Sequence, residues 1–365
     1  MATVSAARSV TASAGGRRVR MGLIGLGRMG QIHATALSSR CPSAELACVV
    51  DADGKRAADV AARCAVPWSS SVDGLLEDPT VPAVVLATPT ATHADLVVRA
   101  ARAGKHVFCE KPLSLQRSAT LSALEAVETA GVKLQVGFHR RFDPDWAAVH
   151  DRIVAGELGR PYLFRTSLRD MRAPRVEYLA GSGGFFLDVT IHDLDVARWL
   201  VGEIVQISAH GVGLSDPGFA EIGDVDTAVV VLHFENGALG VIDNSRSAGY
   251  GYECSTEIMG SSATARIDNP RARNYEWRTP GWAAHELPRD FEQRYPTAYA
   301  LELEAFATCV RDDSAPRVTG RDALAAFELA SAADASWRAG LPVALRALRE
   351  PAGVRYEYDE PAPGG

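Results

Sequence analysis

Short apolar segments alternate with amphipathic helical patterns along the first third of the chain. Each apolar segment has the length of a strand and is followed by a polar turn and by apolar residues at helical spacing. This alternation predicts parallel strands joined by right-handed helical crossovers, with helices on both faces of the sheet. The expected strands are 19–24, 46–50, 83–87, 106–108 and 134–137, and the expected helices are 31–38, 55–63, 94–103 and 115–130.

Beyond residue 140 the pattern changes to strand following strand, which predicts an antiparallel sheet. Asn236-Gly237 lies between two of these strands and is a strong signal for a type I′ hairpin. The expected strands are 161–168, 204–210, 227–234, 239–245, 253–259 and 263–268, with helices at 146–155, 185–200, 298–310 and 322–337.

The predicted fold class is therefore α/β, with a doubly wound parallel sheet at 19–140 and an α+β domain with a large, mostly antiparallel sheet at 141–347. Residues 1–18 are expected to form a disordered extension, and 348–365 a C-terminal tail.

The segment Val19–Gly30, VRMGLIGLGRMG, combines the first expected strand with a glycine turn and the start of a helix. Gly25 permits the tight turn, Gly27 allows the backbone to approach a pyrophosphate, and Gly30 allows the helix to pack closely on the strand. The helix N-terminus offers unpaired N–H groups and a partial positive charge to phosphates. The motif indicates a dinucleotide site, but glycine turns also serve ordinary strand-to-helix packing.

A carboxylate follows the second strand at the position expected of a ribose ligand. Asp51 lies 21 residues after Gly30, and an acid there accepts hydrogen bonds from the adenosine ribose and repels a 2′-phosphate. NAD is therefore expected as the cofactor in preference to NADP. Two alternatives remain: Asp51 as a helix N-cap, and use of NADP through the nearby Lys55 and Arg56.

The amino-acid composition is that of an ordinary soluble globular protein. The 365 residues are 47% apolar and 23% charged, which is enough for two domains with cores of their own. The apolar runs have strand length, so no membrane span is expected. A net charge of −7 without a long basic run makes nucleic acid an unexpected partner.

The six cysteines form no CxxC pair and no Cys/His ligand spacing, which favours reduced thiols and a cytoplasmic location. Residues 1–16 are rich in Ala, Ser and Gly, and a targeting peptide is the alternative to a disordered extension.

Two further strand ends carry candidate functional residues. Thr88-Pro89-Thr90-Ala91-Thr92-His93 follows the third strand, where a rigid proline and small hydroxyl residues suit the nicotinamide side of a dinucleotide. A helix N-cap at Thr92 is the compatible alternative. Glu110-Lys111-Pro112 follows the fourth strand, and the proline ring disfavours helical backbone at Lys111. Its ammonium is then held at the sheet edge above the cofactor, although a solvated surface lysine would look the same.

The segment GGFFLDVTIHDLD, residues 183–195, opens with glycines and continues as a helix. Asp188 and His192 are four residues apart, so they are expected on one face, where the carboxylate orients the imidazole and raises its proton affinity. Such a pair suits a general base, and Asp195 can share the face. The alternatives are an intrahelical pair without a role and a metal site, but the lack of a second histidine at a zinc spacing argues against metal.

Tyr250-Gly251-Tyr252 is expected to open a strand with both phenols on one face, since side chains two apart point the same way. Asn244 and Arg246 share a face of the preceding strand in the same manner. Such a face suits a polyhydroxylated ligand, and a solvated sheet face is the alternative.

Taken in order, these stretches resemble the Gfo/Idh/MocA family of nicotinamide-dependent oxidoreductases, whose fold has an N-terminal Rossmann domain, from Val19 to about Leu345. Within the family, QVGFHRRFD, DVTIHDLD and YGY look most like the inositol 2-dehydrogenases. The motifs that carry the resemblance are GLIGLGRMG, TPTATH, FCEKPLS, QVGFHRRFDP, GGFFLDVTIHDLDVARWL and YGYE.

The resemblance implies that Lys111 contacts both the nicotinamide region and the substrate hydroxyl, that His192 is the catalytic base, and that Asp188 pairs with it. The other substrate-pocket residues that it implies are Arg140, Asp170, Asp195, Tyr250 and Tyr252. The cofactor-contacting residues that it implies are Gly25, Gly27, Arg28, Met29, Asp51, Thr88, His93 and Glu110, beside the motif positions Gly30 and Pro89 and the shared Lys111.

The reaction implied is NAD-dependent oxidation of a secondary ring hydroxyl of a cyclitol or sugar, without a metal, by a homodimer or homotetramer. Arg169, Arg172 and Arg175 depart from the family pattern and are candidates for binding a phosphate, a carboxylate or a partner subunit. The alternatives are epimerase or glycosidase chemistry with transient oxidation, another sugar or sugar-phosphate dehydrogenase or reductase, and a dinucleotide-binding regulator without turnover.

Overall fold

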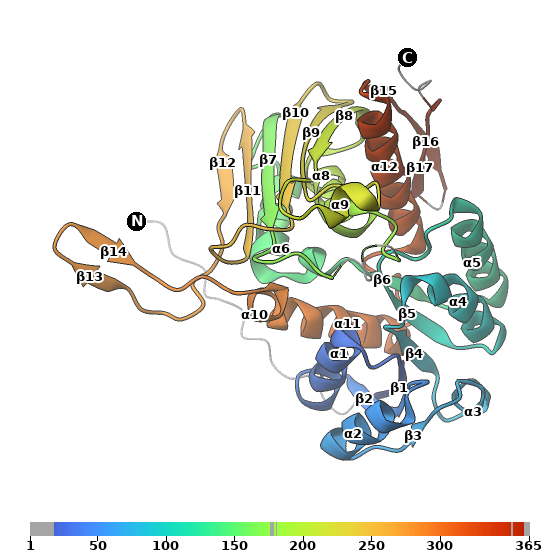
Figure 1. Ribbon diagram of the computed structural model, residues 1–365. Helices are drawn as coiled ribbons and strands as arrows, with labels where there is room; N and C mark the ends of the chain where they lie inside the picture. The colour runs from blue at the N-terminus through green and yellow to red at the C-terminus, as the bar shows by residue number, and fades with distance from the viewer. Residues whose placement is uncertain (1–17, 176–178, 180, 352, 361–365) are drawn as a thin grey trace, which may run out of the picture.

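The computed structural model describes residues 18–175, 179, 181–351 and 353–360. The expected extension therefore lies outside the described residues, except for Arg18. Two sheets, each with its own helices, are stacked one above the other with loops and helices between them (Figure 1). Within the described part of the chain, no helix is long and apolar enough to cross a membrane.

The first sheet contains six parallel strands in the order β3-β2-β1-β4-β5-β6, which is a doubly wound arrangement. Its central strand β4 is fully buried, as expected of a strand covered by helices on both faces. The strands are β1 (Val19–Ile24), β2 (Ala44–Val50), β3 (Trp68–Ser69), β4 (Ala83–Leu86), β5 (His106–Glu110) and β6 (Leu134–Gly137). The helices are α1 (Arg28–Ser39), α2 (Gly54–Cys64), α3 (Asp73–Glu77), η1 (Thr90–Thr92), α4 (His93–Arg102) and α5 (Arg117–Ala130).

The second sheet contains seven strands in the order β12-β11-β7-β10-β9-β8-β15. Only β7 and β10 pair in parallel, so the expected mostly antiparallel sheet is confirmed. The strands are β7 (Pro161–Arg169), β8 (Ile204–Val212), β9 (Thr227–Phe234), β10 (Leu239–Ser245), β11 (Glu253–Gly260), β12 (Thr264–Ile267) and β15 (Val343–Ala344).

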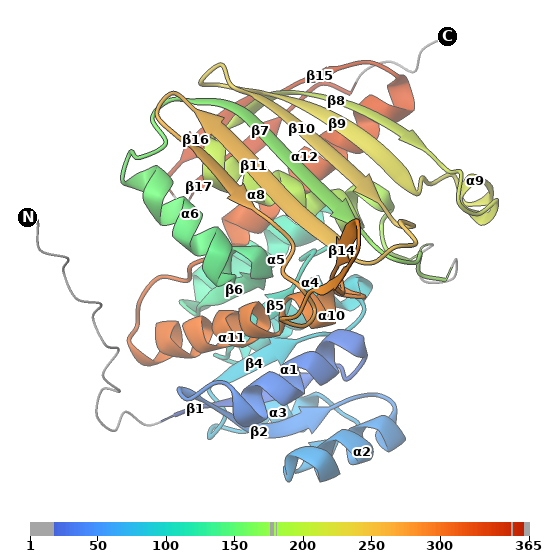
Figure 2. The same ribbon diagram turned by 90° about the vertical axis from the view of Figure 1, so that its left-hand side faces the viewer.

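Helices α8 and α12 cover one face of this sheet (Figure 2). The remaining elements are η2 (His139–Phe142), α6 (Pro144–Val154), the π-helix η3 (Phe186–Thr190), α8 (Ile191–Val201), α9 (Gly218–Glu221), α10 (Phe291–Arg294), α11 (Pro296–Arg311), α12 (Gly320–Ala339) and the hairpins β13 (Trp277–Thr279)–β14 (Trp282–Ala284) and β16 (Arg346–Glu350)–β17 (Gly353–Glu357).

The hairpin between β9 and β10 forms where the sequence predicts it, but its turn has a different type. The N–H of Gly237 donates to the carbonyl of Phe234 at 2.9 Å, and Gly237 has a φ of 87°. Asn236 is not among the residues with positive φ, whereas a type I′ turn needs positive φ at both central positions. The connection is a type I turn followed by a left-handed glycine, which gives the same chain reversal.

Two C-terminal segments differ from expectation. Helix α11 was expected around the second sheet, but Leu303 and Phe306 pack into the core of the first domain beside Met21 and Leu23. An amphipathic helix reveals that one face is buried but not which partner buries it. The expected tail also contains the β16–β17 hairpin, whose second strand packs on α12.

Candidate active site

The glycine turn at the end of β1 has the geometry that a pyrophosphate requires. Gly25 has a φ of 90°, and a Cβ there would lie 2.7 Å from the backbone of Ala87. A Cβ at Gly30 would lie 2.0 Å from the carbonyl oxygen of Gly25, so the helix packs against the turn only without a side chain. By contrast, Gly27 faces open space within 4 Å and has no side-chain cap over the N-terminus of α1. These residues fit a dinucleotide phosphate at the helix N-terminus.

Asp51 supports the glycine turn from the neighbouring strand. Its carboxylate accepts hydrogen bonds from the backbone N–H of Leu26 at 2.7 Å and of Asp53 at 2.9 Å. The N-cap of α2 is Asp53, which accepts from the N–H groups of Lys55 and Arg56. The structure therefore gives the capping role to Asp53, and Asp51 remains the candidate ribose ligand. The guanidinium of Arg56 lies 3.4 Å from Asp51, so the site carries a cation as well as an acid.

His93 connects the two loops that follow β4 and β5. Its buried ring lies within hydrogen-bond distance of two backbone carbonyls, that of Thr88 at 2.8 Å and that of Pro112 at 2.9 Å. The hydroxyl of Thr92 donates toward Thr88 and Pro89 and does not cap α4. His93 therefore holds the loop after β4 against the loop after β5. In the first of these loops Pro89 is exposed and Thr88 is partly exposed.

Lys111 lies at the carboxyl end of β5 and reaches across to the second domain. Its ammonium donates to the carbonyl of Asp188 at 2.8 Å and to the carboxylate of Asp188 at 3.2 Å. The other carboxylate oxygen accepts from Arg246 at 3.0 Å. Asp188 sits in the π-helix η3, a local irregularity that often marks functional sites. Lys111 and Arg246 both lower the pKa of the Asp188 carboxyl against the burial that would raise it.

His192 follows Asp188 on α8 and is held by aromatic contacts. Its ring packs edge-on against Phe138, with centroids 6.0 Å apart, and against His139 at 5.2 Å. Burial, followed by the charge of Lys111, lowers the pKa of His192 well below its usual value. The expectation that Asp188 raises this proton affinity is therefore wrong, because the carboxylate is directed to Lys111 and Arg246. A neutral imidazole is nevertheless the form that can accept a proton.

Asp170 follows β7 and lies close to the same charges. Burial, with a contribution from the charge of Asp188, raises its pKa to about 6, while Arg246 and Lys111 oppose the rise. Its backbone N–H donates to the carbonyl of Ser245 at 2.8 Å, which places Asp170 beside the end of β10. Asp170 is thus brought together with Lys111, Asp188 and Arg246.

Two residues assigned to the substrate pocket are instead partners in buried ion pairs. The guanidinium of Arg140 contacts Asp193, and that of Arg141 contacts Asp195, with all four side chains at most 7% exposed. Charges taken this far from water must be paired. The structure therefore shows Arg140 and Asp195 as 2% exposed partners in ion pairs that stabilise this layer, and their contact with substrate stays a prediction.

The two tyrosines of YGYE lie on different sides of the sheet. Strand β11 begins only at Glu253, and Gly251, with a φ of 150°, breaks the expected alternation. Tyr252 is buried against Tyr295, with centroids 6.3 Å apart, whereas Tyr250 is 53% exposed. The predicted shared face of the two phenols is therefore wrong.

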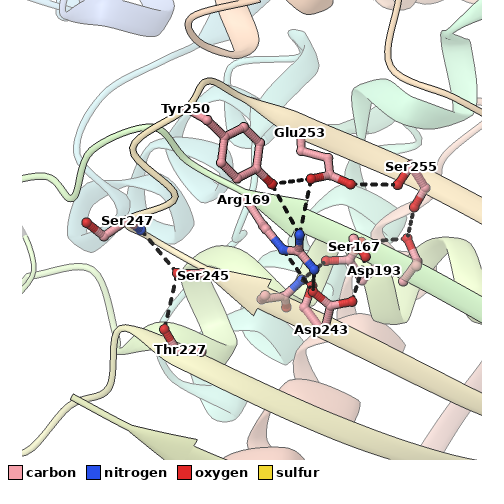
Figure 3. Close-up of polar contacts among 12 residues, drawn as sticks. Ser167, Arg169, Asp193, Thr227, Asp243, Ser245, Ser247, Tyr250, Glu253 and Ser255 are labelled. Carbon is pink, nitrogen blue, oxygen red and sulfur yellow. Dashed lines mark hydrogen bonds and ion pairs between the residues drawn. The ribbon is translucent and has the colours of Figure 1, made fainter. Parts of the chain in front are cut away.

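Arg169 is neutralised on the outer face of the second sheet (Figure 3). Its guanidinium contacts Asp243 and Glu253, and it donates to the hydroxyl of Tyr250 at 3.1 Å. Arg172 and Arg175 are exposed in the following loop. The three arginines therefore form no single anion-binding cluster, and Tyr250 belongs to the outer-face network.

Among the remaining cofactor candidates, Met29 packs against the core while Arg28 pairs with Asp290 and Glu292 next to α10. Glu110 turns inward, where it contacts His33 at 2.6 Å and accepts from the N–H of Lys111 at 3.2 Å.

Arg246, which the sequence placed on a sheet face suited to a ligand without giving it a role, and His139, which it did not assign, also lie at the site. Arg246 is 1% exposed, pairs with Asp188 and stacks over Phe185 at 5.4 Å. Its two-residue spacing from the buried Asn244 was a usable signal, since the pattern had already placed both on one face. His139 gave no such signal, because its contact with His192 depends on how η2 meets α8.

A glycine turn that fits a pyrophosphate, an acid at the position expected of a ribose ligand, and a lysine that crosses to Asp188 just before His192 form the arrangement expected of a nicotinamide-dependent oxidoreductase acting on CH–OH groups. Comparison with known proteins agrees. Residues 19–138 match the family model described as an oxidoreductase family with an NAD-binding Rossmann fold, and residues 150–345 match its C-terminal α/β domain. The chain belongs to the Gfo/Idh/MocA family.

Individual relatives cover nearly the whole chain. The scyllo-inositol 2-dehydrogenase (NAD(+)) of Bacillus subtilis is 40% identical over 92% of this chain and 99% of its own length. The structure of a putative myo-inositol dehydrogenase from Sinorhizobium meliloti has a TM-score of 0.86 at 38% identity, covering 89% of this chain and 99% of that one. Scyllo-inositol dehydrogenase from Lactobacillus casei, solved with NAD(H) and scyllo-inositol, has a TM-score of 0.84 at 27% identity, covering 90% and 99%. The predicted family, fold class and NAD cofactor are confirmed.

Proposed function

We propose that this chain oxidises a secondary ring hydroxyl of an inositol with NAD, and that His192 is the base. The observation that carries the proposal is the contact of Lys111 with Asp188, which joins the end of β5 to the helix that bears His192. The relatives described as inositol 2-dehydrogenases support the substrate class. Membership of the family supports NAD as the cofactor. When bound, NAD would accept the hydride from the substrate carbon.

Each side chain then has a defined task. His192 is neutral and accepts the proton of the hydroxyl, while the Lys111 ammonium stabilises the negative charge that develops on the oxygen. Asp188 holds Lys111 and Arg246 in place and limits the positive charge that these two cations would otherwise place beside the imidazole. Asp170 offers a carboxylate to another hydroxyl of the ring.

An uncharged cyclitol fits this site better than a phosphorylated sugar. Arg169, the last residue of β7, is already paired with Asp243 and Glu253 on the outer face of the sheet. Arg246 is paired with Asp188. A phosphate would have to compete with these carboxylates for its cations.

Turnover of a substrate panel tests the proposal. We expect myo- or scyllo-inositol to produce NADH, detected by its absorbance, and NAD to be preferred to NADP because Asp51 repels a 2′-phosphate. Inositol phosphates and aldoses serve as comparison substrates. Activity confined to phosphorylated substrates would contradict the proposal, and product formation without net NADH would indicate transient oxidation instead.

We also propose that the chain forms a homodimer or homotetramer through the outer face of the second sheet. Val229, Leu239 and Met259 are exposed there at 42%, 45% and 41%, next to the paired charges around Arg169. Exposed apolar side chains gathered on one sheet face are the kind of surface that identical subunits bury. Light scattering should give a mass of two or four chains, and Leu239→Glu should lower it; a monomeric wild type would contradict this proposal.

The six cysteines are free thiols in the structure. They support the cytoplasm as the compartment that we propose for the enzyme.

A further inference from the structure

A second cluster of ionisable groups lies behind the candidate active site. His33 on α1, Glu110 at the end of β5 and Glu302 on α11 are 0%, 7% and 0% exposed. One potential ligand atom from each residue lies within 4.8 Å of the others. Nε2 of His33 and Oε1 of Glu110 are 2.6 Å apart. The cluster therefore brings together the cofactor helix, the strand that carries Lys111, and the helix that crosses from the C-terminal half of the chain.

Burial and the neighbouring carboxylate of Glu110 disfavour ionisation of Glu302. Neither oxygen of Glu302 has a hydrogen-bond partner among the described residues, and Nδ1 of His33 has none either. A carboxylate so far from water, beside a second carboxylate, is strongly disfavoured relative to the neutral acid. Burial and the charge of Glu110 accordingly raise the pKa of Glu302 well above its ordinary value of 4.5.

The other ionisable groups packed around the cluster, Tyr299, His139 and Cys41, add no positive charge to it. Tyr299 lies one turn earlier on α11 and packs against both His33 and His139. Burial raises the pKa of Tyr299 and lowers that of His139, so both are neutral. Burial likewise raises the pKa of the Cys41 thiol to about 12. Protonation of Glu302 removes the second negative charge from the cluster.

A metal ion is a poorer explanation of the same three residues. The 2.6 Å separation of His33 Nε2 and Glu110 Oε1 is that of a strong hydrogen bond. Two ligands of one zinc-like ion, each about 2.0–2.2 Å from it in a tetrahedral site, would lie more than about 3 Å apart. The distance therefore favours a proton between these atoms.

We propose that Glu302 carries a proton at neutral pH and that the His33–Glu110–Glu302 cluster is a positioning device for Lys111. Glu110 links the cluster to Lys111, because its second carboxylate oxygen accepts a hydrogen bond from the backbone N–H of Lys111 at 3.2 Å. His33 anchors Glu110 to the helix that begins at the glycine turn. The role of Lys111 rests on the proposed function, but the protonation of Glu302 does not.

Infrared spectroscopy of the whole protein tests the protonation directly. Wild type at pH 7 should show the carbonyl stretch of a buried carboxylic acid, and Glu302→Gln should lack it. Glu304→Gln, a half-buried neighbour on the same helix, is the matched control and should keep the band. An identical spectrum for wild type and Glu302→Gln would overturn the inference, as would a stoichiometric divalent cation that survives dialysis.

The pH dependence of stability gives a second measure. Because the pKa of Glu302 is raised in the folded state, folding takes up a proton, and the free energy of unfolding should fall as pH rises above about 4.5. Glu302→Gln should remove that part of the slope, while Glu304→Gln should not. An unchanged slope would contradict a buried proton.

Activity tests the positioning role. We expect Glu302→Ala to lower kcat about tenfold, because the space that the side chain leaves beside Glu110 lets Glu110 and Lys111 shift. Glu302→Gln should restore most of that loss, since an amide resembles the protonated acid. Equal kcat values for the alanine, glutamine and wild-type proteins would refute positioning. An absent reaction in wild type would refute the proposed function and leave the infrared result standing.

Discussion

Replacing His192 by alanine should lower kcat by about 10²- to 10⁴-fold, the range that a general base contributes. NAD affinity should stay close to that of wild type, because the glycine turn and Asp51 belong to the other domain. The measurements are initial rates of NADH formation and calorimetric titration with NAD. His150→Ala is the matched control, since His150 stacks on Trp199 with centroids 4.2 Å apart on the surface of α6 and should not affect turnover.

Lys111→Ala should lower kcat about 10²-fold, because it removes the cation expected to stabilise the developing oxyanion. Lys133→Ala removes a lysine that pairs with the exposed Asp313 and serves as its control. If the His192 and Lys111 variants both turned over like wild type, the roles proposed for them would be untenable. If both lost NAD binding as well, the effects would reflect a damaged cofactor site.

The fold was largely predictable because its strands are distinguished by local composition. Strands buried on both faces, such as β4, have continuous apolar sequences, and those of the second sheet alternate between buried and exposed positions. β3 was missed because two residues are too few for a pattern. The location of α11 could not be inferred, since the partner of its apolar face depends on tertiary packing.

The site was predictable where its geometry is local. Gly25, Gly27 and Gly30 have the steric environments that their spacing indicated. The relation of Asp188 to His192 was not predictable from an ideal helix. The N–H of Ile191 bonds to the carbonyl of Phe186, five residues earlier, so residues four apart no longer lie directly above one another. The same turn directs Asp188 toward Lys111 and Arg246, which are far from it in sequence.

The burial of Arg140 in an ion pair could not be predicted from the sequence. Sequence motifs identify polar residues near a site, but they do not distinguish residues that contact the substrate from residues that stabilise the layer beneath the site. Arg140 is 2% exposed and contacts Asp193, which also accepts from Asn244 at 2.9 Å and from Thr166 at 3.3 Å. This network connects η2, α8, β7 and β10. Its expected contribution is to stability, and it can be measured separately from turnover.

Asp193→Ala should lower the free energy of unfolding by about 3–5 kcal/mol, because it leaves the guanidinium of Arg140 buried without a counter-charge. Urea denaturation followed by circular dichroism measures the loss. Asp243→Ala is the control on the same sheet: its pair with Arg169 has side chains 36% and 34% exposed, so its removal should cost about 0–1 kcal/mol. The double variant Asp193→Ala, Arg140→Met should recover part of the loss, since both charges are then absent. Similar losses for Asp193→Ala and Asp243→Ala would show that the Arg140–Asp193 pair is solvated and does not bind the layer together.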